Sequence, residues 1–280
     1  MPRNVASEST PVTGATGGRS SSLVPFLFGV AGRAEIPGTV LVRLLGDFGL
    51  TEAAARALLL RMRQEGMLAS TRRGRVVDYR LAGEYGRRFD RIRRAGQETP
   101  PAWTGSFHAL LYQVPESRRA FRDALRRSAV NLGYGLLQQG VLIAVRDRTD
   151  QLDLLAEPPE DVRVFVTRLE MAEADAAQAA RLAWDLDTLA EVYAAHTRTL
   201  RAAVHDRPTP PEPSPDTLRR YAELLRIPMV DTLRSPQLPE SLLPPNWPMP
   251  GLWRAIAQVQ QVYGGPAMAY VGHRLAEAEH

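Results

Sequence analysis

Apolar residues recur every three or four positions along two stretches in the first quarter of the chain. The apolar positions of the first stretch are Val40, Leu41, Leu44 and Leu45. Those of the second stretch are Ala54, Ala55, Leu58, Leu59 and Met62. This spacing places each set on one face of a helix. We therefore expect one helix opened by Pro37 and a second helix with Thr51 as its N-cap.

After the second helix the pattern changes to two short extended segments joined by a basic turn. The side chains alternate along the later segment, with Val76 and Asp78 on one side and Val77 and Tyr79 on the other. Gly74 supplies the backbone freedom that a tight reversal needs at the tip of this hairpin. Helix, turn, helix and hairpin in this order predict a winged helix-turn-helix domain over residues 21–98.

The rest of the chain divides at the prolines of residues 99–101. Residues 106–114, 140–145 and 162–169 read as strands, and residues 116–132 read as an amphipathic helix. This alternation predicts a small ferredoxin-like domain over residues 102–172.

A helical pattern follows in the last third of the chain. Helices are expected over residues 176–205, 216–226 and 250–263. We assign residues 175–280 to a helical C-terminal domain. Residues 1–20 are rich in Ser, Thr, Gly and Pro and are expected to form a disordered tail. A serine-capped helix through Phe28 follows the tail, and the fold class is α+β, mainly helical.

Positive charge is concentrated on the second helix, the hairpin and the segment after them. The whole chain has a formal net charge of +4, but residues 51–95 contain twelve arginines and five acidic residues. A basic helix is expected over residues 84–94. The chain contains no lysine, so every cationic side chain, histidine aside, is a forked guanidinium able to pair with phosphate or guanine. A confined basic patch of this kind indicates binding to double-stranded DNA.

The exposed side of the second helix supplies the candidates for reading the major groove. They are Thr51, Arg56, Ala57, Leu60, Arg61, Arg63 and Gln64. The hairpin arginines are expected to hold the phosphate backbone, and they are Arg72, Arg73, Arg75 and Arg80. The alternative for Leu60 is packing against another part of the protein. A homodimer with two such helices would bind a palindromic operator.

The chain lacks the residues that several classes of function require. The chain has no cysteine, and its five histidines are scattered outside any HExxH motif. No apolar run approaches the roughly 18 residues of a membrane span. We expect no catalytic residues, no metal and no cofactor, in a cytoplasmic protein that does not bind a membrane. A divalent-metal nuclease is disfavoured because the first strand of the central domain has no carboxylate.

Several segments from about residue 22 onward form a distinctive series along the chain. In the first domain they are residues 23–29, 50–68, 74–75 and 79–81. In the middle they are residues 103–105, 118–127, 132–135 and 139–141. Near the end they are Trp184-Asp185-Leu186 and the proline-rich string over residues 236–248. In these segments the chain resembles the PaaX family of transcriptional regulators.

The resemblance implies a homodimeric repressor that a small molecule releases from its operator. The founding member of the family responds to phenylacetyl-coenzyme A, so an aryl- or acyl-coenzyme A is the expected class of effector. Candidate effector-binding residues in the helical domain are Arg181, Trp184, Arg219, Arg226, Trp247 and Arg254. An alternative role for the two tryptophans is to anchor helices in the core. The alternative function is a fold of this family repurposed as a small-molecule-binding protein or enzyme with weak or no DNA binding.

Overall fold

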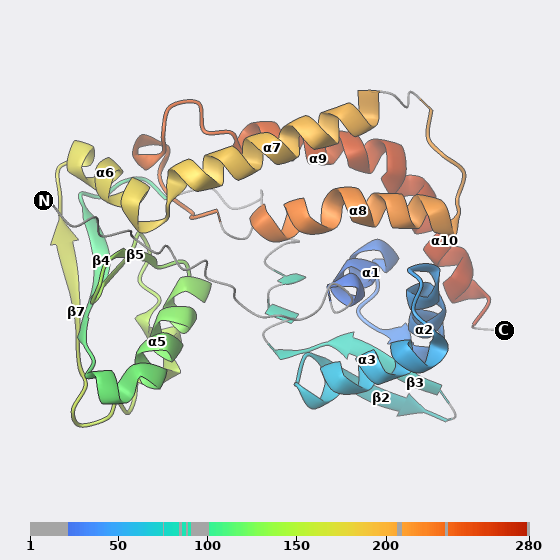
Figure 1. Cartoon of the computed structure of the whole chain (residues 1–280), viewed down its shortest axis with the longest axis horizontal. Coiled ribbons are helices and arrows are strands. Elements are labelled where there is room, and N and C mark those ends of the chain that lie inside the picture. The colour runs from blue at the N-terminus through green and yellow to red at the C-terminus, as the bar shows by residue number, and fades with distance from the viewer. Residues whose placement is uncertain are drawn as a thin grey trace, which may run out of the picture. The chain divides into compact units, whose positions relative to one another are not determined.

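The computed structural model describes most of the chain and divides into two compact units. The described residues are 22–74, 76–83, 86–87, 89–90, 101–205, 209–232 and 235–278, without the Arg73 side chain. The first unit comprises Met1–Phe89, Glu212–Ala222 and Pro266–His280, and the second comprises Asp90–Pro211 and Glu223–Gly265. The fold is a mixture of helices and two antiparallel sheets (Figure 1). The expected tail and most of the expected helix over residues 84–94 lie outside the described residues.

The first unit places a helix pair beside a three-stranded sheet. Its elements before the C-terminal segments are α1 (Leu23–Ala31), β1 (Ile36–Pro37), α2 (Gly38–Asp47), α3 (Glu52–Gln64), β2 (Leu68–Arg73) and β3 (Val76–Leu81). The strand order is β1-β3-β2, and Arg73 pairs with Val76 across a two-residue turn. Val40, Leu41, Leu44 and Leu45 of α2 are fully buried. The helix, turn, helix and hairpin of the sequence prediction are therefore present.

Three details of this unit differ from the prediction. Ser22 makes no side-chain cap bond to α1. Ile36 and Pro37 form a short strand on β3, a pairing partner too distant in sequence for local patterning to reveal. Ala54 is exposed, because it lies in the first turn of α3, where only Ala55 faces the core.

The second unit contains a four-stranded sheet with one long helix against it. Its elements are β4 (Ser106–Gln113), α5 (Arg119–Asn131), β5 (Gly135–Gln138), β6 (Val141–Ala144) and β7 (Arg163–Glu170). The order is β5-β6-β4-β7, and all neighbouring strands are antiparallel. Leu125 and Ala129 of α5 pack with Leu110 and Leu142 of the sheet in one core cluster. Strand β5 was not predicted, since glycines at 133 and 135 indicate a break.

The remaining α-helices and one π-helical turn follow β7 in the described chain. They are α6 (Glu173–Ala183), α7 (Leu186–His205), α8 (Pro215–Thr232), α9 (Met249–Val259), a π-helical turn (Gln260–Gly264) and α10 (Gly265–Ala276). The prediction of one helix over residues 176–205 is wrong, because Asp185 adopts φ 48° and breaks the chain into α6 and α7. Helix α8 continues past residue 226 with Pro228 inside it, and α10 was not predicted. No helix among the described residues has both the length and the apolarity to cross a membrane.

Candidate nucleic-acid interface

Helix α3 has one buried face and one polar, exposed face. Thr51 caps the helix, since its Oγ1 accepts a hydrogen bond from the Ala54 main-chain N–H at 3.2 Å. The buried side chains are Ala55, Leu58, Leu59 and Met62. The residues proposed for groove contact are all exposed, namely Thr51, Arg56, Ala57, Leu60, Arg61, Arg63 and Gln64. Leu60 is 45% exposed, so within this chain it does not pack fully against another part of the protein.

Arg56 has an intrahelical partner on this exposed face. Its Nη2 lies 2.6 Å from Oε1 of Glu52, one turn earlier, and both side chains are more than half exposed. Exposed pairs of this kind contribute less than about 1 kcal/mol. A base edge or a phosphate therefore competes with Glu52 for this guanidinium at little energetic cost.

The β2–β3 hairpin presents arginines on both of its faces. Gly74 adopts φ 61°, and Arg72 Nε donates a hydrogen bond to the Gly74 carbonyl oxygen at 3.0 Å. Arg72 pairs with Val77, whereas Arg80 pairs with Ala69. Because side chains alternate along a strand, Arg72 and Arg80 point to opposite faces, and both are exposed. Arg75 and the Arg73 side chain lie outside the described residues.

The six candidate effector residues are divided between the two compact units. Arg219 belongs to the first unit, and the other five belong to the second. Trp184 donates from its indole nitrogen to the Gly133 carbonyl oxygen at 3.3 Å and lies beside Phe107. Trp247 stacks edge-on against Tyr193, with ring centroids 5.6 Å apart. These contacts fit the alternative role of helix anchors, and effector contact by either tryptophan stays a prediction.

The two remaining arginines of the second unit lie on different helices. Arg226 is half-buried in α8. Arg254 is exposed on α9, where its Nε donates a hydrogen bond to the Pro250 carbonyl oxygen at 3.3 Å.

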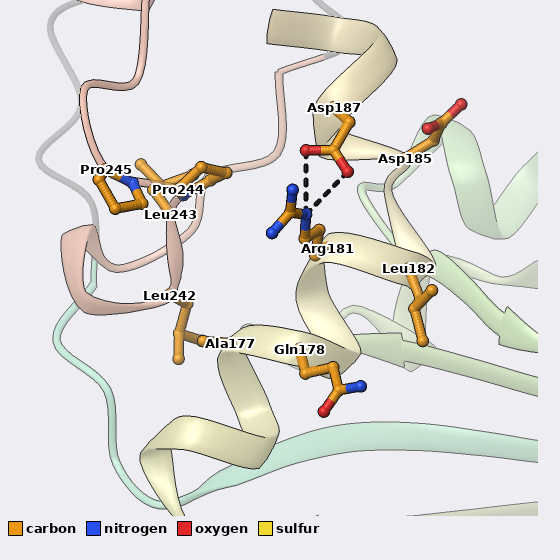
Figure 2. Close-up of a pocket in the computed structure, with 10 residues that line it drawn as sticks. All are labelled: Ala177, Gln178, Arg181, Leu182, Asp185, Asp187, Leu242, Leu243, Pro244 and Pro245. Atoms are coloured by element: carbon orange, nitrogen blue, oxygen red, sulfur yellow. Dashed lines mark hydrogen bonds and ion pairs between the residues drawn. The ribbon is translucent and has the colours of Figure 1, made fainter.

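Arg181 lies at an open pocket of about 560 Å³ in the second unit. Figure 2 shows its guanidinium reaching toward Asp187, and its Nε donates to the two carboxylate oxygens at 2.9 and 2.7 Å. This hydrogen bond and the charge of Asp187 raise the pKa of Arg181. Residues 242–245 and Leu182 supply apolar surface, and Asp185 adds a second carboxylate. Because Asp187 already pairs with Arg181, an anionic ligand must compete with Asp187 for this guanidinium.

A metal-dependent reaction has no visible centre in the described part of the chain. No group of three or more His, Asp or Glu side chains is placed there to hold a metal ion. Strand β4 reads Ser-Phe-His-Ala-Leu-Leu-Tyr-Gln and carries no carboxylate. His108 of this strand instead faces Asp147, with Nδ1 and Oδ2 at 3.7 Å.

Sequence reasoning missed one cluster of polar residues at the end of α2. Asp47 accepts hydrogen bonds from Arg219 and Tyr270, which are 172 and 223 residues away in the sequence. No local pattern marks such partners.

Comparison with known proteins gives matches in both units. Residues 19–85 match the family model described as PaaX-like protein, and residues 100–182 match the model of the PaaX protein central Cas2-like domain. The transcriptional repressor PaaX of Escherichia coli (strain K12) is 26% identical over 249 residues, which are 84% of this chain and 76% of that protein. An uncharacterized protein of Mycobacterium tuberculosis, Rv0674, has a similar solved structure. Its TM-score is 0.57 at 25% identity, over 93% of this chain and 99% of that one.

Proposed function

Because this chain belongs to the PaaX family, we propose that it is a transcriptional repressor that binds double-stranded DNA through α3 and the β2–β3 hairpin. The proposal rests on the division of α3 into one buried face and one exposed face. Every residue named for groove contact is exposed, while the opposite face is buried in the unit's core. An exposed helix beside a basic hairpin fits a major groove and its flanking phosphates.

The architecture supports finer assignments within the same proposal. Helices α2 and α3 with the β2–β3 hairpin constitute a winged helix-turn-helix. The order β5-β6-β4-β7, with every neighbour antiparallel and α5 connecting β4 to β5, supports a ferredoxin-like central domain. A homodimer would present two copies of α3 to a palindromic operator. The first strand of this sheet, β4, has no carboxylate, and a metal nuclease would need one there.

We also propose that a small molecule releases the repressor from DNA. The pocket beside Arg181 supports this part of the proposal, because it combines an apolar wall with one guanidinium. An aryl- or acyl-coenzyme A thioester has the matching groups, an apolar acyl chain and phosphates. Its phosphates would displace Asp187 from Arg181, since the two anions compete for the same donors.

A binding titration separates the repressor from the repurposed fold. The probes are a duplex taken from upstream of the gene that encodes the chain and a random-sequence duplex of equal length. A repressor binds the upstream duplex at least about a thousandfold more tightly at physiological salt. Acyl-coenzyme A thioesters are then added to the complex to test release. Equal affinity for both duplexes, or no binding at low ionic strength, contradicts the proposal.

A further inference from the structure

The C-terminal end of α2 is held by two segments from the far end of the chain. Tyr270 of α10 donates its hydroxyl hydrogen to Oδ2 of Asp47 at 2.8 Å. Arg219 of α8 donates from Nη1 to the main-chain oxygen of Asp47 at 2.6 Å and also pairs with Asp216. All of these residues belong to the first unit, which also contains α3.

Asp47 is an unfavourable residue for its position in the helix. It is the last residue of α2, where the helix dipole is negative and a carboxylate is repelled. Its carbonyl oxygen is also one of the last acceptors of the helix, and no N–H group within the helix donates to it. The hydroxyl of Tyr270 and the guanidinium of Arg219 offset both costs. A local rule is thus broken at one residue and compensated by distant parts of the chain, which is the pattern of a functional position.

The orientation of Tyr270 is itself fixed by a residue one turn later in the same helix, α10. Its side chain is 8% exposed, and its hydroxyl accepts a hydrogen bond from Arg274 Nε at 3.1 Å. The Arg274 guanidinium also lies over the tyrosine ring, 5.3 Å from the centroid. Arg274 pairs in turn with Glu277 at 3.2 Å. The donor to Asp47 therefore has one defined orientation.

Asp47 is separated from the cap of α3 by a turn of three residues. In this turn the Gly49 N–H donates to the Gly46 carbonyl oxygen at 2.8 Å, and the Leu50 N–H donates to that of Leu45 at 3.2 Å. Gly49 takes φ 85°, and Thr51 then begins α3. Holding Asp47 holds the start of this turn, and with it the angle at which α3 leaves α2.

We propose that Asp47, Tyr270 and Arg219 form a positioning cluster that sets α3 for reading DNA, so that α10 belongs to the DNA-binding machinery. The inference rests on the proposed function, because its benefit is sequence-specific affinity. The proposed role does not require any of the three residues to contact DNA. We expect the loss of these contacts to weaken sequence-specific binding, because reading bases requires α3 at one angle. Non-specific attraction to phosphates does not depend on that angle and should be unchanged.

The test compares conservative variants on the upstream and random-sequence duplexes. Tyr270→Phe removes one hydrogen bond to a carboxylate and is expected to weaken binding to the upstream duplex about tenfold. Binding to the random duplex should stay within about twofold. Asp47→Ala should reduce the affinity for the upstream duplex as much as Tyr270→Phe does. The double variant should lose no more affinity than either single variant. Asp47→Asn should retain most of the affinity, because its amide oxygen still accepts the hydrogen bond.

Tyr221→Phe is the matched control, since Tyr221 is a buried tyrosine of the same unit whose ring packs on Phe26. Its affinity for both duplexes should equal that of the unmodified chain. Equal losses in the Tyr270 and Tyr221 variants would overturn the cluster, as would unchanged affinity in Tyr270→Phe.

Amide hydrogen exchange tests the cluster without any DNA. In Tyr270→Phe the amides of residues 48–50 should exchange several-fold faster, while Tyr221→Phe leaves them unchanged. If the unmodified chain fails to discriminate between the duplexes, the proposed function fails, and this exchange alone decides whether the cluster holds the turn. Unchanged exchange overturns the inference in either case, as does faster exchange combined with undiminished specific affinity.

Discussion

At the scale of single residues, the exposed face of α3 divides its tasks between charged and apolar side chains. Arg56 is the residue on this face with a well-defined intrahelical partner, Glu52. A guanidinium held near the start of the helix is suited to bidentate contact with guanine, the commonest specific contact in the major groove. In the proposed complex with DNA, Leu60 and Ala57 would offer apolar contact to thymine methyl groups from the same face.

Changing Arg56 to alanine should therefore relax sequence preference. Loss of a bidentate base contact costs about 1–3 kcal/mol of discrimination, and the loss on random DNA should be smaller. Fluorescence anisotropy on single-base variants of the upstream duplex measures the change. Glu52→Gln, which releases Arg56, is the control and should not reduce affinity. Equal losses on cognate and random DNA would refute the base-reading role of Arg56.

Asp147 gives the second unit a defined pH dependence. Hydrogen bonds from the Thr149 main-chain N–H and hydroxyl, at 3.0 and 2.7 Å, lower the pKa of Asp147 below its ordinary value of 3.8. A lowered pKa means that the stabilisation is present above that ordinary value and is lost as the pH falls through the lower one. All four tryptophans, at 103, 184, 247 and 253, belong to the second unit, so their fluorescence follows its unfolding.

Asp147→Asn should lower the urea midpoint at pH 7, because the amide cannot replace a charged acceptor. The gap from the unmodified chain should narrow as the pH falls below 3.8, because the carboxyl group then takes up a proton in the unfolded chain before it does so in the folded one. Asp153→Asn removes the same charge without touching Thr149 and should show no such gap. A gap that stays constant down to pH 3 would contradict the assignment.

At the scale of elements, local signals predicted what local interactions determine. The cap at Thr51, the turn at Gly74 and the apolar face of α3 apart from Ala54 all depend on residues a few positions apart, and the structure contains each of them. The break at Asp185 was missed because a non-glycine residue takes a left-handed conformation there. Helix α10 was missed because the wide π-helical turn before it shifts the apolar repeat.

The candidate site was likewise predicted where it depends on local sequence and missed where it depends on distant contacts. The exposed residues of α3 follow from helical periodicity, so the sequence alone named them. The contacts of Asp47 with Tyr270 and Arg219 span more than half of the chain, and they depend on tertiary packing that no periodicity encodes.

The junction of α6 with β5 depends on close packing at one glycine. A Cβ atom on Gly135 would lie 2.7 Å from two atoms of the Trp184 indole. Gly135→Ala should therefore destabilise the second unit by about 1–3 kcal/mol through overpacking, measured by urea unfolding with tryptophan fluorescence. Gly251→Ala is the matched control, since a Cβ there meets nothing within 4 Å and favours the helix. Equal midpoints for the two variants would contradict the packing argument.

At the scale of the whole molecule, the positive charge is concentrated in the segment that contains the proposed DNA-binding surface. The formal net charge is +4, yet residues 51–95 alone carry twelve arginines against five acidic residues, so the remaining residues are net acidic. The described arginines of α3 and the hairpin are exposed. The pocket beside Arg181 belongs to the other compact unit, so the proposed DNA-binding surface and the proposed ligand site lie in different parts of the chain.

The most direct test of the central claim, that α3 and the hairpin grip duplex DNA, is the salt dependence of binding. Affinity for the upstream duplex is measured from low to physiological salt for Arg72→Ala/Arg80→Ala and for Arg163→Ala/Arg168→Ala, two exposed arginines of β7. The hairpin variant should bind more weakly, with a slope of log affinity against log salt shallower by about 2, one phosphate contact per arginine. The β7 variant carries the same change in net charge and should keep the slope of the unmodified chain. Equal slopes for all three proteins would contradict the account.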